Sequence, residues 1–173
     1  SKVAICELNP IVEQTYLLTG DTQNAGEAVA NKLGIGKAYT GLLPVDKVAK
    51  LEEIMHHRQS SKSVIFVGDG INDAPVLTRA DVGIAMGALG SDAAIEAADV
   101  VIMDDQLSKI PTAIKIAQKT LGILKKNLAF AFGVKIVFLI LGAAGFITMW
   151  GAVFADVGVT LIAVINSLRA LRV

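Results

Sequence analysis

The side chains best suited to chemistry lie in the segment Gly68-Asp69-Gly70-Ile71-Asn72-Asp73-Ala74-Pro75, which follows an apolar run. Glycines on both sides of Asp69 let the backbone and the carboxylate approach a small charged ligand. Asp73 lies at the expected start of a helix, whose first turn tolerates Pro75. Two carboxylates in a tight loop repel each other unless a cation lies between them, and Mg2+ accepts one or two carboxylates beside water and phosphate oxygens. The loop therefore predicts a Mg2+ site, and the alternative is an ordinary turn rich in Gly, Asp and Pro.

Two other segments place polar groups at the end of an expected strand or the start of an expected helix. Thr19-Gly20-Asp21 follows a second apolar run, and Lys47 follows Pro44 at the start of a helical pattern. Taken alone, Thr19-Gly20-Asp21 is as compatible with a simple helix cap or turn as with a functional loop, and a lone lysine is most often a solvated helix residue. Its position after Pro44 favours a phosphate-binding role for Lys47.

The first 126 residues alternate short apolar runs with helical patterns, which is typical of a parallel α/β sheet. Polar residues after such strands lie at the carboxyl edge, where open α/β sheets bind ligands. Because residues 63–67 are apolar without alternation, we expect that strand to be buried on both faces. The expected strands are 15–18, 38–40, 63–67, 82–85 and 100–103, and the expected helices are 23–33, 45–57, 74–79, 92–97 and 110–124.

Charge divides the chain into two parts. Residues 1–126 hold 13 Lys and Arg and 15 Asp and Glu, whereas residues 127–173 hold three cations and one anion. The segments 128–147 and 149–168 each carry one charge over 20 residues, long enough to span a bilayer as helices of about 30 Å. We therefore predict a domain over 1–126 and a transmembrane hairpin over 127–173. A soluble protein with two buried core helices is the alternative.

Orientation and partners follow from the same charges. Lysines precede the first span and arginines follow the second, but the connecting turn has neither, so residues 1–126 are expected in the cytoplasm. No signal peptide is expected at the start, because polar residues interrupt the first 16 positions. Zero net charge argues against nucleic-acid binding, and a single cysteine excludes an internal disulfide.

Lys135 and Asp156 are the charges within the two spans. Each costs about 2.5 to 3.5 kcal/mol at a helix centre on insertion scales, so both should face protein or a water-filled path. Their depths from the cytoplasmic ends differ by about 10 Å, counted at 1.5 Å per residue, which leaves open whether they touch. A pair that only holds the helices together is the alternative to a functional one.

Together these motifs resemble the heavy-metal-transporting P-type ATPases. The resemblance rests on TGD, the lysine after LLP, GDGINDAP, and the run ADVGIAMGALGSDAAIEAADVVIMDD followed by IPTAIKIAQKT, and it extends from about Leu17 to Val173. It implies the carboxyl-terminal part of such a pump: part of a haloacid-dehalogenase-like (Rossmann-like) phosphorylation domain, then the last two transmembrane helices. The implied partners are the bilayer and the rest of the pump, namely the earlier helices and the actuator and nucleotide-binding domains. The implied location is the plasma (inner) membrane.

The resemblance also implies roles for individual residues. Asp69 would coordinate Mg2+ with support from Asp73, while Thr19, Lys47 and Asn72 would hold the phosphoryl group of a reaction that uses ATP. Asp21 would lie near the nucleotide or the hinge. The expected catalytic positions are Thr19, Gly20, Asp21, Lys47 and Asn72, and the expected cofactor-binding positions are Thr19, Asp21, Lys47 and Gly70.

In the resembling family, a lysine in the penultimate span and Asp-Val-Gly in the last one mark exporters of Zn2+, Cd2+ and Pb2+. Lys135 and Asp156-Val157-Gly158 match that pattern, so Asp156 is the expected ligand of the transported metal and Lys135 its counter-ion. The chain departs from the family in lacking DKTGT, the motif whose aspartate is phosphorylated, so by itself it is expected to complete no phosphorylation cycle. The competing hypotheses are a membrane-anchored phosphatase of the haloacid dehalogenase superfamily and a non-catalytic fragment that requires a partner.

Overall fold

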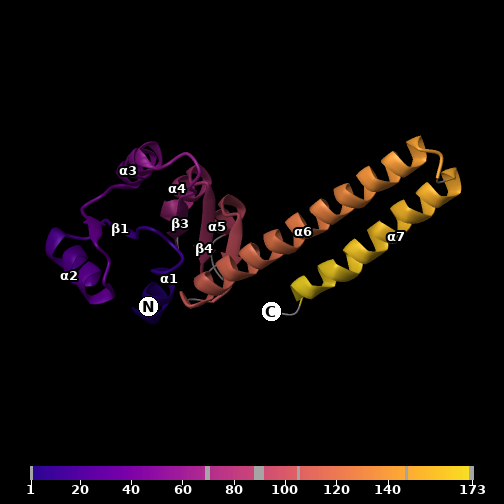
Figure 1. Ribbon diagram of the computed structural model, residues 1–173. Helices are drawn as coiled ribbons and strands as arrows, with labels where there is room; N and C mark the ends of the chain where they lie inside the picture. Colours follow the sequence, from indigo (N-terminus) through magenta and orange to yellow (C-terminus); the bar gives the residue numbers. More distant parts are fainter. Residues whose placement is uncertain (1, 69–70, 88–91, 105, 147, 172–173) are drawn as a thin grey trace. The chain divides into compact units, whose positions relative to one another are not determined.

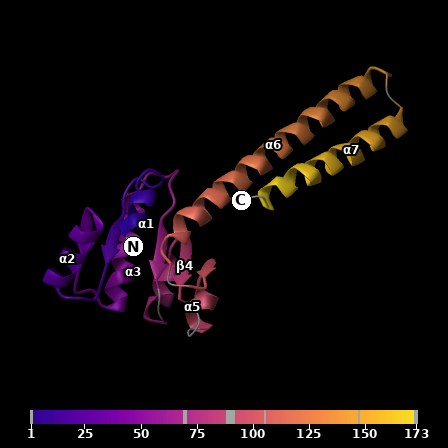
Figure 2. The same cartoon turned by 90° about the horizontal axis from the view of Figure 1, so that it is seen from below.

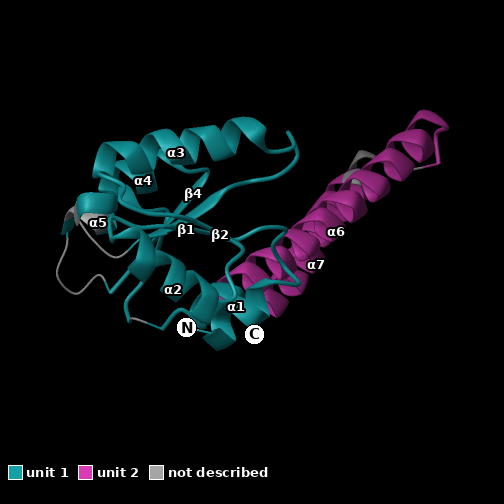
Figure 3. Cartoon of the chain, turned by 90° about the vertical axis from the view of Figure 1, so that its left-hand side faces the viewer, with its two compact units in different colours: residues 1–111 teal, residues 112–173 magenta. Residues whose placement is uncertain are grey.

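The structure is a computed structural model and describes residues 2–68, 71–87, 92–104, 106–146 and 148–171. The chain forms two compact units, residues 1–111 and residues 112–173 (Figure 3). The division falls within one long helix. The predicted boundary at 126/127 separates the expected soluble domain from the expected transmembrane hairpin, and it stays a prediction.

The first unit alternates helices with parallel strands, as the apolar runs predict (Figure 1). The predicted helices at 23–33, 74–79 and 92–97 have the expected bounds, and the strands agree to within a residue or two. The elements are α1 (Lys2–Leu8), β1 (Tyr16–Leu18), α2 (Gln23–Leu33), β2 (Lys37–Tyr39), α3 (Pro44–His57), β3 (Ile65–Gly68), the 3-10 helix η1 (Ile71–Asp73), α4 (Ala74–Arg79), β4 (Val82–Met86), α5 (Asp92–Ala97) and β5 (Val100–Ile102).

The strands form two parallel sheets. One sheet pairs β1 with β2, and the other has the order β3-β4-β5. Figure 3 shows α3 and α4 on one side of the strands, and α1 and α2 on the other. Parallel pairing brings the carboxyl ends of the strands to one edge, so it fixes where the residues that follow each strand must lie.

The core of this unit lies between β4 and α4. Leu77 and Val76 of α4 and Ala85 of β4 are almost fully buried, and burying each of the two larger side chains contributes about 1.5 to 3 kcal/mol. The backbones approach closely, because a Cβ at Gly83 would lie 2.6 Å from the carbonyl oxygen of Leu77. This contact places the start of α4, and the acidic residue before it, against the sheet.

Two features of the first unit differ from the sequence-based expectation. Strand β3 lies at an edge of its sheet and Ile65 is 37% exposed, so the expected burial on both faces is wrong for this strand. Strand β4 has that buried role instead. Helix α1 was not predicted, and it is held by Ala4, Ile5 and Leu8, which lie on one helical face and are buried.

The second unit is a helical hairpin (Figure 2). The helix expected at 110–124 and the span expected at 128–147 form one continuous helix, α6 (Lys109–Ala143), of 35 residues. Gly145, with φ of 80°, makes the turn, and Thr148 accepts a hydrogen bond from Gly151 N–H at the start of α7 (Met149–Ser167). A 3-10 turn, η2 (Leu168–Leu171), follows.

Both long helices meet the length and hydropathy expected of a membrane span. The most apolar 18-residue window of each has no residue buried inside the described chain. The two helices are therefore not the covered core of the residues described here, which argues against the soluble alternative.

Candidate functional site

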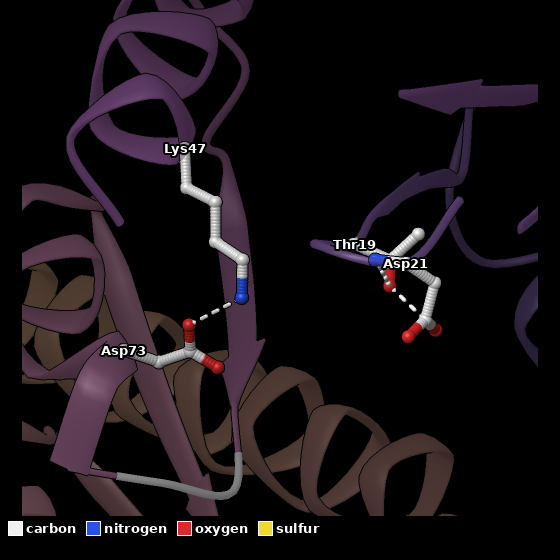
Figure 4. A network of polar contacts seen from close by, with 4 residues as sticks. All are labelled: Thr19, Asp21, Lys47 and Asp73. Carbon is white, nitrogen blue, oxygen red and sulfur yellow. Dashed lines mark hydrogen bonds and ion pairs between the residues drawn. The ribbon is translucent and has the colours of Figure 1, made fainter. Parts of the chain in front are cut away.

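An ion pair between Lys47 and Asp73 joins two of the predicted site segments (Figure 4). The ammonium nitrogen of Lys47 lies 2.7 Å from Oδ1 of Asp73, and the two side chains are 17% and 12% exposed. Lys47 lies in the first turn of α3, which Pro44 begins and where the Asp46 carboxylate accepts the Leu43 N–H. The structure thus brings Lys47 and Asp73 together, while the phosphate-binding role of Lys47 stays a prediction.

Asp73 is paired with Lys47 and packs closely against Gly68. It ends η1, immediately before α4, and counted over the whole residue it is 9% exposed. A buried carboxylate is costly unless it is paired, and Lys47 supplies that partner. A Cβ at Gly68 would lie 2.9 Å from the Asp73 Cβ and 3.0 Å from its Oδ2. Only glycine fits at position 68 while the carboxylate keeps this place.

The Thr19-Gly20-Asp21 segment is a hydrogen-bonded turn after β1. The hydroxyl of Thr19 donates to Oδ2 of Asp21 at 2.9 Å and accepts the Asp21 N–H at 3.1 Å. Leu42 N–H donates to the carbonyl of Thr19, and a Cβ at Gly20 would lie 3.1 Å from the Leu42 carbonyl oxygen. The turn is therefore attached to the loop that leads into α3 and Lys47. Figure 4 draws the Thr19–Asp21 pair apart from the Lys47–Asp73 pair, with no interaction joining them.

Lys50, one turn after Lys47, connects α3 to the other sheet. Its ammonium lies 4.5 Å from the ring centroid of Tyr39 on β2 and 2.5 Å from Oε2 of Glu53. The hydrogen bond with Glu53 raises the pKa of Lys50, and the same bond lowers the pKa of Glu53. Helix α3 thus contacts the β3 side through Lys47 and the β2 side through Lys50. Lys50 was not among the predicted site residues, and its spacing of three from Lys47 was the available signal.

Other predicted residues are placed as follows. Asn72 lies in η1 and is exposed, adjacent to Asp73. Asp69 and Gly70 lie outside the described residues. Gly68 was missed as a site residue although it begins the GDGINDAP motif, because sequence alone does not show how closely Asp73 lies against it.

In the hairpin, Lys135 of α6 and Asp156 of α7 form a direct ion pair. The distance from Nζ to Oδ1 is 3.4 Å, and the side chains are 71% and 68% exposed. Asp156 also lines an open recess of about 300 Å3 with residues of its own helix. Among the residues that the structure describes, no group of three His, Cys, Asp or Glu lies close enough to hold a metal. Asp156 is the carboxylate of the described hairpin, and the Lys135 ammonium is its paired cation.

A parallel α/β sheet with a lysine and a carboxylate beside its carboxyl edge is compatible with a haloacid-dehalogenase-like fold. In agreement, the family model for haloacid dehalogenase-like hydrolases matches residues 43–114. The fold is this class of sheet followed by two long apolar helices, as predicted.

Longer relatives match nearly the whole chain. It is 58% identical over 170 residues to a cadmium, zinc and cobalt-transporting ATPase of Bacillus subtilis (strain 168), covering 98% of the chain and 24% of the relative. It is 51% identical over 158 residues to a zinc-transporting ATPase of Synechocystis, covering 91% of the chain and 22% of the relative. A crystal structure of a zinc-transporting PIB-type ATPase in the E2.Pi state matches with a TM-score of 0.91 at 38% identity. The match covers 98% of this chain and 27% of the chain in that structure.

The chain belongs to the heavy-metal-transporting P-type ATPases. It spans about a quarter of the length of these curated relatives. It is accordingly similar to one portion of a multi-pass membrane pump.

Proposed function

We propose that this chain is the carboxyl-terminal part of an ATP-driven pump that exports divalent heavy metals, Zn2+, Cd2+ or Pb2+. The observation that carries the proposal is the ion pair of Lys135 and Asp156 inside two membrane-length helices, in a chain that also carries the partly buried Lys47–Asp73 pair. The chemistry of a membrane-anchored phosphatase requires no charged pair at that depth, where each charge costs about 2.5 to 3.5 kcal/mol.

The phosphoryl site suits Mg2+ and phosphate. Asp73 supplies a nearly buried oxygen ligand of the type that Mg2+ prefers, and Lys47 supplies an ammonium within hydrogen-bond distance of it. We assign Mg2+ to Asp69 and Asp73, and the phosphoryl oxygens to Thr19, Lys47 and Asn72. Bound Mg2+ would neutralise charge that develops on the transferred group.

The residues of this chain would position the phosphoryl group and stabilise its transition state, but they would not attack the phosphorus. In phosphoryl transfer the charge is spread over three equatorial oxygens, and an ammonium held beside them stabilises the transition state. Lys47 has that role, because α3 fixes it from two sides through Asp73 and, via Lys50, through Tyr39. Thr19 presents a hydroxyl, and Gly20 allows the loop to approach Leu42 closely.

The attacking carboxylate has to come from the rest of the protein. Among the described strands, β1 pairs only with β2 and β3 pairs only with β4, so each has an edge without a partner strand. Such an edge exposes unpaired N–H and C=O groups and readily accepts another strand. We assign these edges to a strand of the remaining pump that carries the phosphorylated aspartate.

In the membrane, Asp156 is the proposed oxygen ligand of the transported cation, and Lys135 neutralises it once the cation has left. A carboxylate suits a divalent borderline cation better than Cu+. Since the described residues provide no cluster of three ligands, the remaining ligands would come from the earlier helices. These helices would also cover the pair, which is two-thirds exposed here. Residues 1–126 would lie in the cytoplasm, beneath the plasma membrane.

Metal-stimulated ATP hydrolysis by the full-length parent tests the proposal. We expect stimulation by Zn2+, Cd2+ or Pb2+, an acid-stable phosphoenzyme, and loss of turnover in Asp69→Asn, whereas residues 1–173 alone should hydrolyse no ATP. Hydrolysis that none of the three metals stimulates would overturn the cargo assignment. Release of phosphate from phosphate esters, with no phosphoenzyme formed from ATP, would indicate a phosphatase instead.

A further inference from the structure

A cleft of about 550 Å3 opens between α6 and the end of α7, near the end of the hairpin that carries the chain terminus. It is distinct from the recess at Asp156. Its lining residues share two properties: most are cationic or small, and they come from both helices. They are Lys119, Gly122, Ile123, Lys126, Asn166 and Arg169.

The α6 side of the cleft is one helical face. Its four lining positions are spaced by three and four residues, which aligns them along the helix. Gly122 provides room, because a Cβ added there would have no atom within 4 Å.

Polar hydrogen bonds hold the two helices together at this cleft. Asn127 accepts a hydrogen bond from Asn166 at 2.6 Å and donates to the carbonyl oxygen of Ala163 and the hydroxyl of Ser167. Arg169 donates weakly to Asn166 at 3.4 Å. The position of the cleft therefore does not depend on apolar packing alone.

The cleft lies where the apolar sequence begins. Lys126 comes two residues before Leu128, the start of the apolar stretch of α6, and Arg169 comes directly after the apolar stretch of α7. Cations at these positions are at the level of lipid headgroups, and basic pockets between transmembrane helices bind anionic headgroups. The lining contains three cations and no carboxylate.

We propose that this cleft binds the phosphate of an anionic phospholipid headgroup, with Lys126 and Arg169 as the main charge partners. The inference rests on the proposed membrane insertion of α6 and α7. An arginine fork and an ammonium are suited to phosphate oxygens. The headgroup alcohol beyond the phosphate would lie beside Gly122, and the glycerol backbone and acyl chains would continue along the apolar surface that starts at Leu128, which is 54% exposed.

The test is phosphatidylglycerol binding to the full-length parent in phosphatidylcholine nanodiscs, counted by native mass spectrometry. Lys126→Gln with Arg169→Gln should weaken retention by about fivefold for each cation removed. Lys115→Gln with Lys125→Gln removes the same charge outside the lining and should weaken it less. Equal losses in both double variants would overturn the proposal, since only the general surface field would then act.

A neutral pair of variants separates shape from charge. Gly122→Phe fills the cleft and should reduce retention, whereas Leu121→Phe adds the same ring outside the lining and should not. Retention unaffected by Gly122→Phe, or displacement of the lipid by soluble glycerol phosphate, would overturn the assignment to a lipid. Metal-stimulated hydrolysis is measured on the same samples, so that loss of the pump function and loss of lipid binding are scored separately.

Discussion

Lys135 and Asp156 lie level with each other across the hairpin, 3.4 Å apart. The Asn127 contacts with Ala163 and Ser167 define the same antiparallel register. Lys135 follows Asn127 by eight residues, and Asp156 precedes Ala163 by seven, about two helical turns in each case. The sequence-based depth difference assumed that Arg169 lies level with Leu128. In the structure the residues level with Asn127, next to Leu128, are those from Ala163 to Ser167.

Substitutions of the two charges should have different effects on the parent pump. Asp156→Ala should abolish metal binding and metal-stimulated hydrolysis, because it removes the proposed ligand. Lys135→Ala should retain some metal but impair release, because the emptied carboxylate loses its partner, and Lys135→Arg should restore much of the rate. Elemental analysis and hydrolysis assays measure both effects. Unchanged zinc content in Asp156→Ala would reduce the pair to a structural ion pair.

Removal of the Lys47 ammonium should act on turnover. We expect Lys47→Ala to lower ATP hydrolysis by the parent by about 100-fold or more, as for other preorganised electrostatic donors. Lys50→Met tests the positioning contact with Tyr39 and Glu53, and its effect should be smaller because Lys50 does not touch Asp73. Steady-state hydrolysis at saturating Mg2+-ATP measures both. Equal losses in the two variants would contradict a direct role for Lys47.

The sequence predicted the order of helices and strands well, because apolar runs and Gly or Asp punctuation report local structure directly. It singled out Lys47 and Asp73 separately, each near the start of a helix, but did not show that the two side chains form an ion pair. The continuity of α6 was missed although Lys125, Lys126 and Asn127 contain no helix breaker.

Features that depend on tertiary neighbours could not be predicted from the sequence. An apolar run such as that of β3 does not reveal which of its edges is paired, so the exposure of Ile65 could not be foreseen. Helix α1 is short and is stabilised by burial of three side chains, which no local propensity shows. The close approach of Gly68 to Asp73 likewise depends on the fold around η1.

Gly68→Ala should lower turnover without unfolding the protein. Its Cβ would lie 2.9 Å from the Asp73 Cβ and 3.0 Å from its carboxylate oxygen, so Asp73 would have to move from Lys47. Gly36→Ala is the matched control, because nothing lies within 4 Å of its Cβ. Hydrolysis and its dependence on Mg2+ concentration measure the shift. If both variants kept the parental Mg2+ dependence, the contact at Gly68 would have no bearing on the site.

Gly83→Ala should instead act on stability. Its Cβ would lie 2.6 Å from the Leu77 carbonyl oxygen and 3.1 Å from the Leu77 carbonyl carbon, and backbone atoms do not move aside as a flexible side chain does. Forcing atoms into a packed core costs about 1 to 3 kcal/mol, so α4 should separate from β4 and the melting temperature of the parent should fall. Thermal unfolding followed by size-exclusion chromatography measures the change, again with Gly36→Ala as the control.

Because α4 begins directly after Asp73, the Lys47–Asp73 pair should weaken in the same variant, and Gly83→Ala should lose turnover at temperatures below its melting point. Full parental turnover together with a lowered melting temperature would show that the α4–β4 contact supports the fold but not the site.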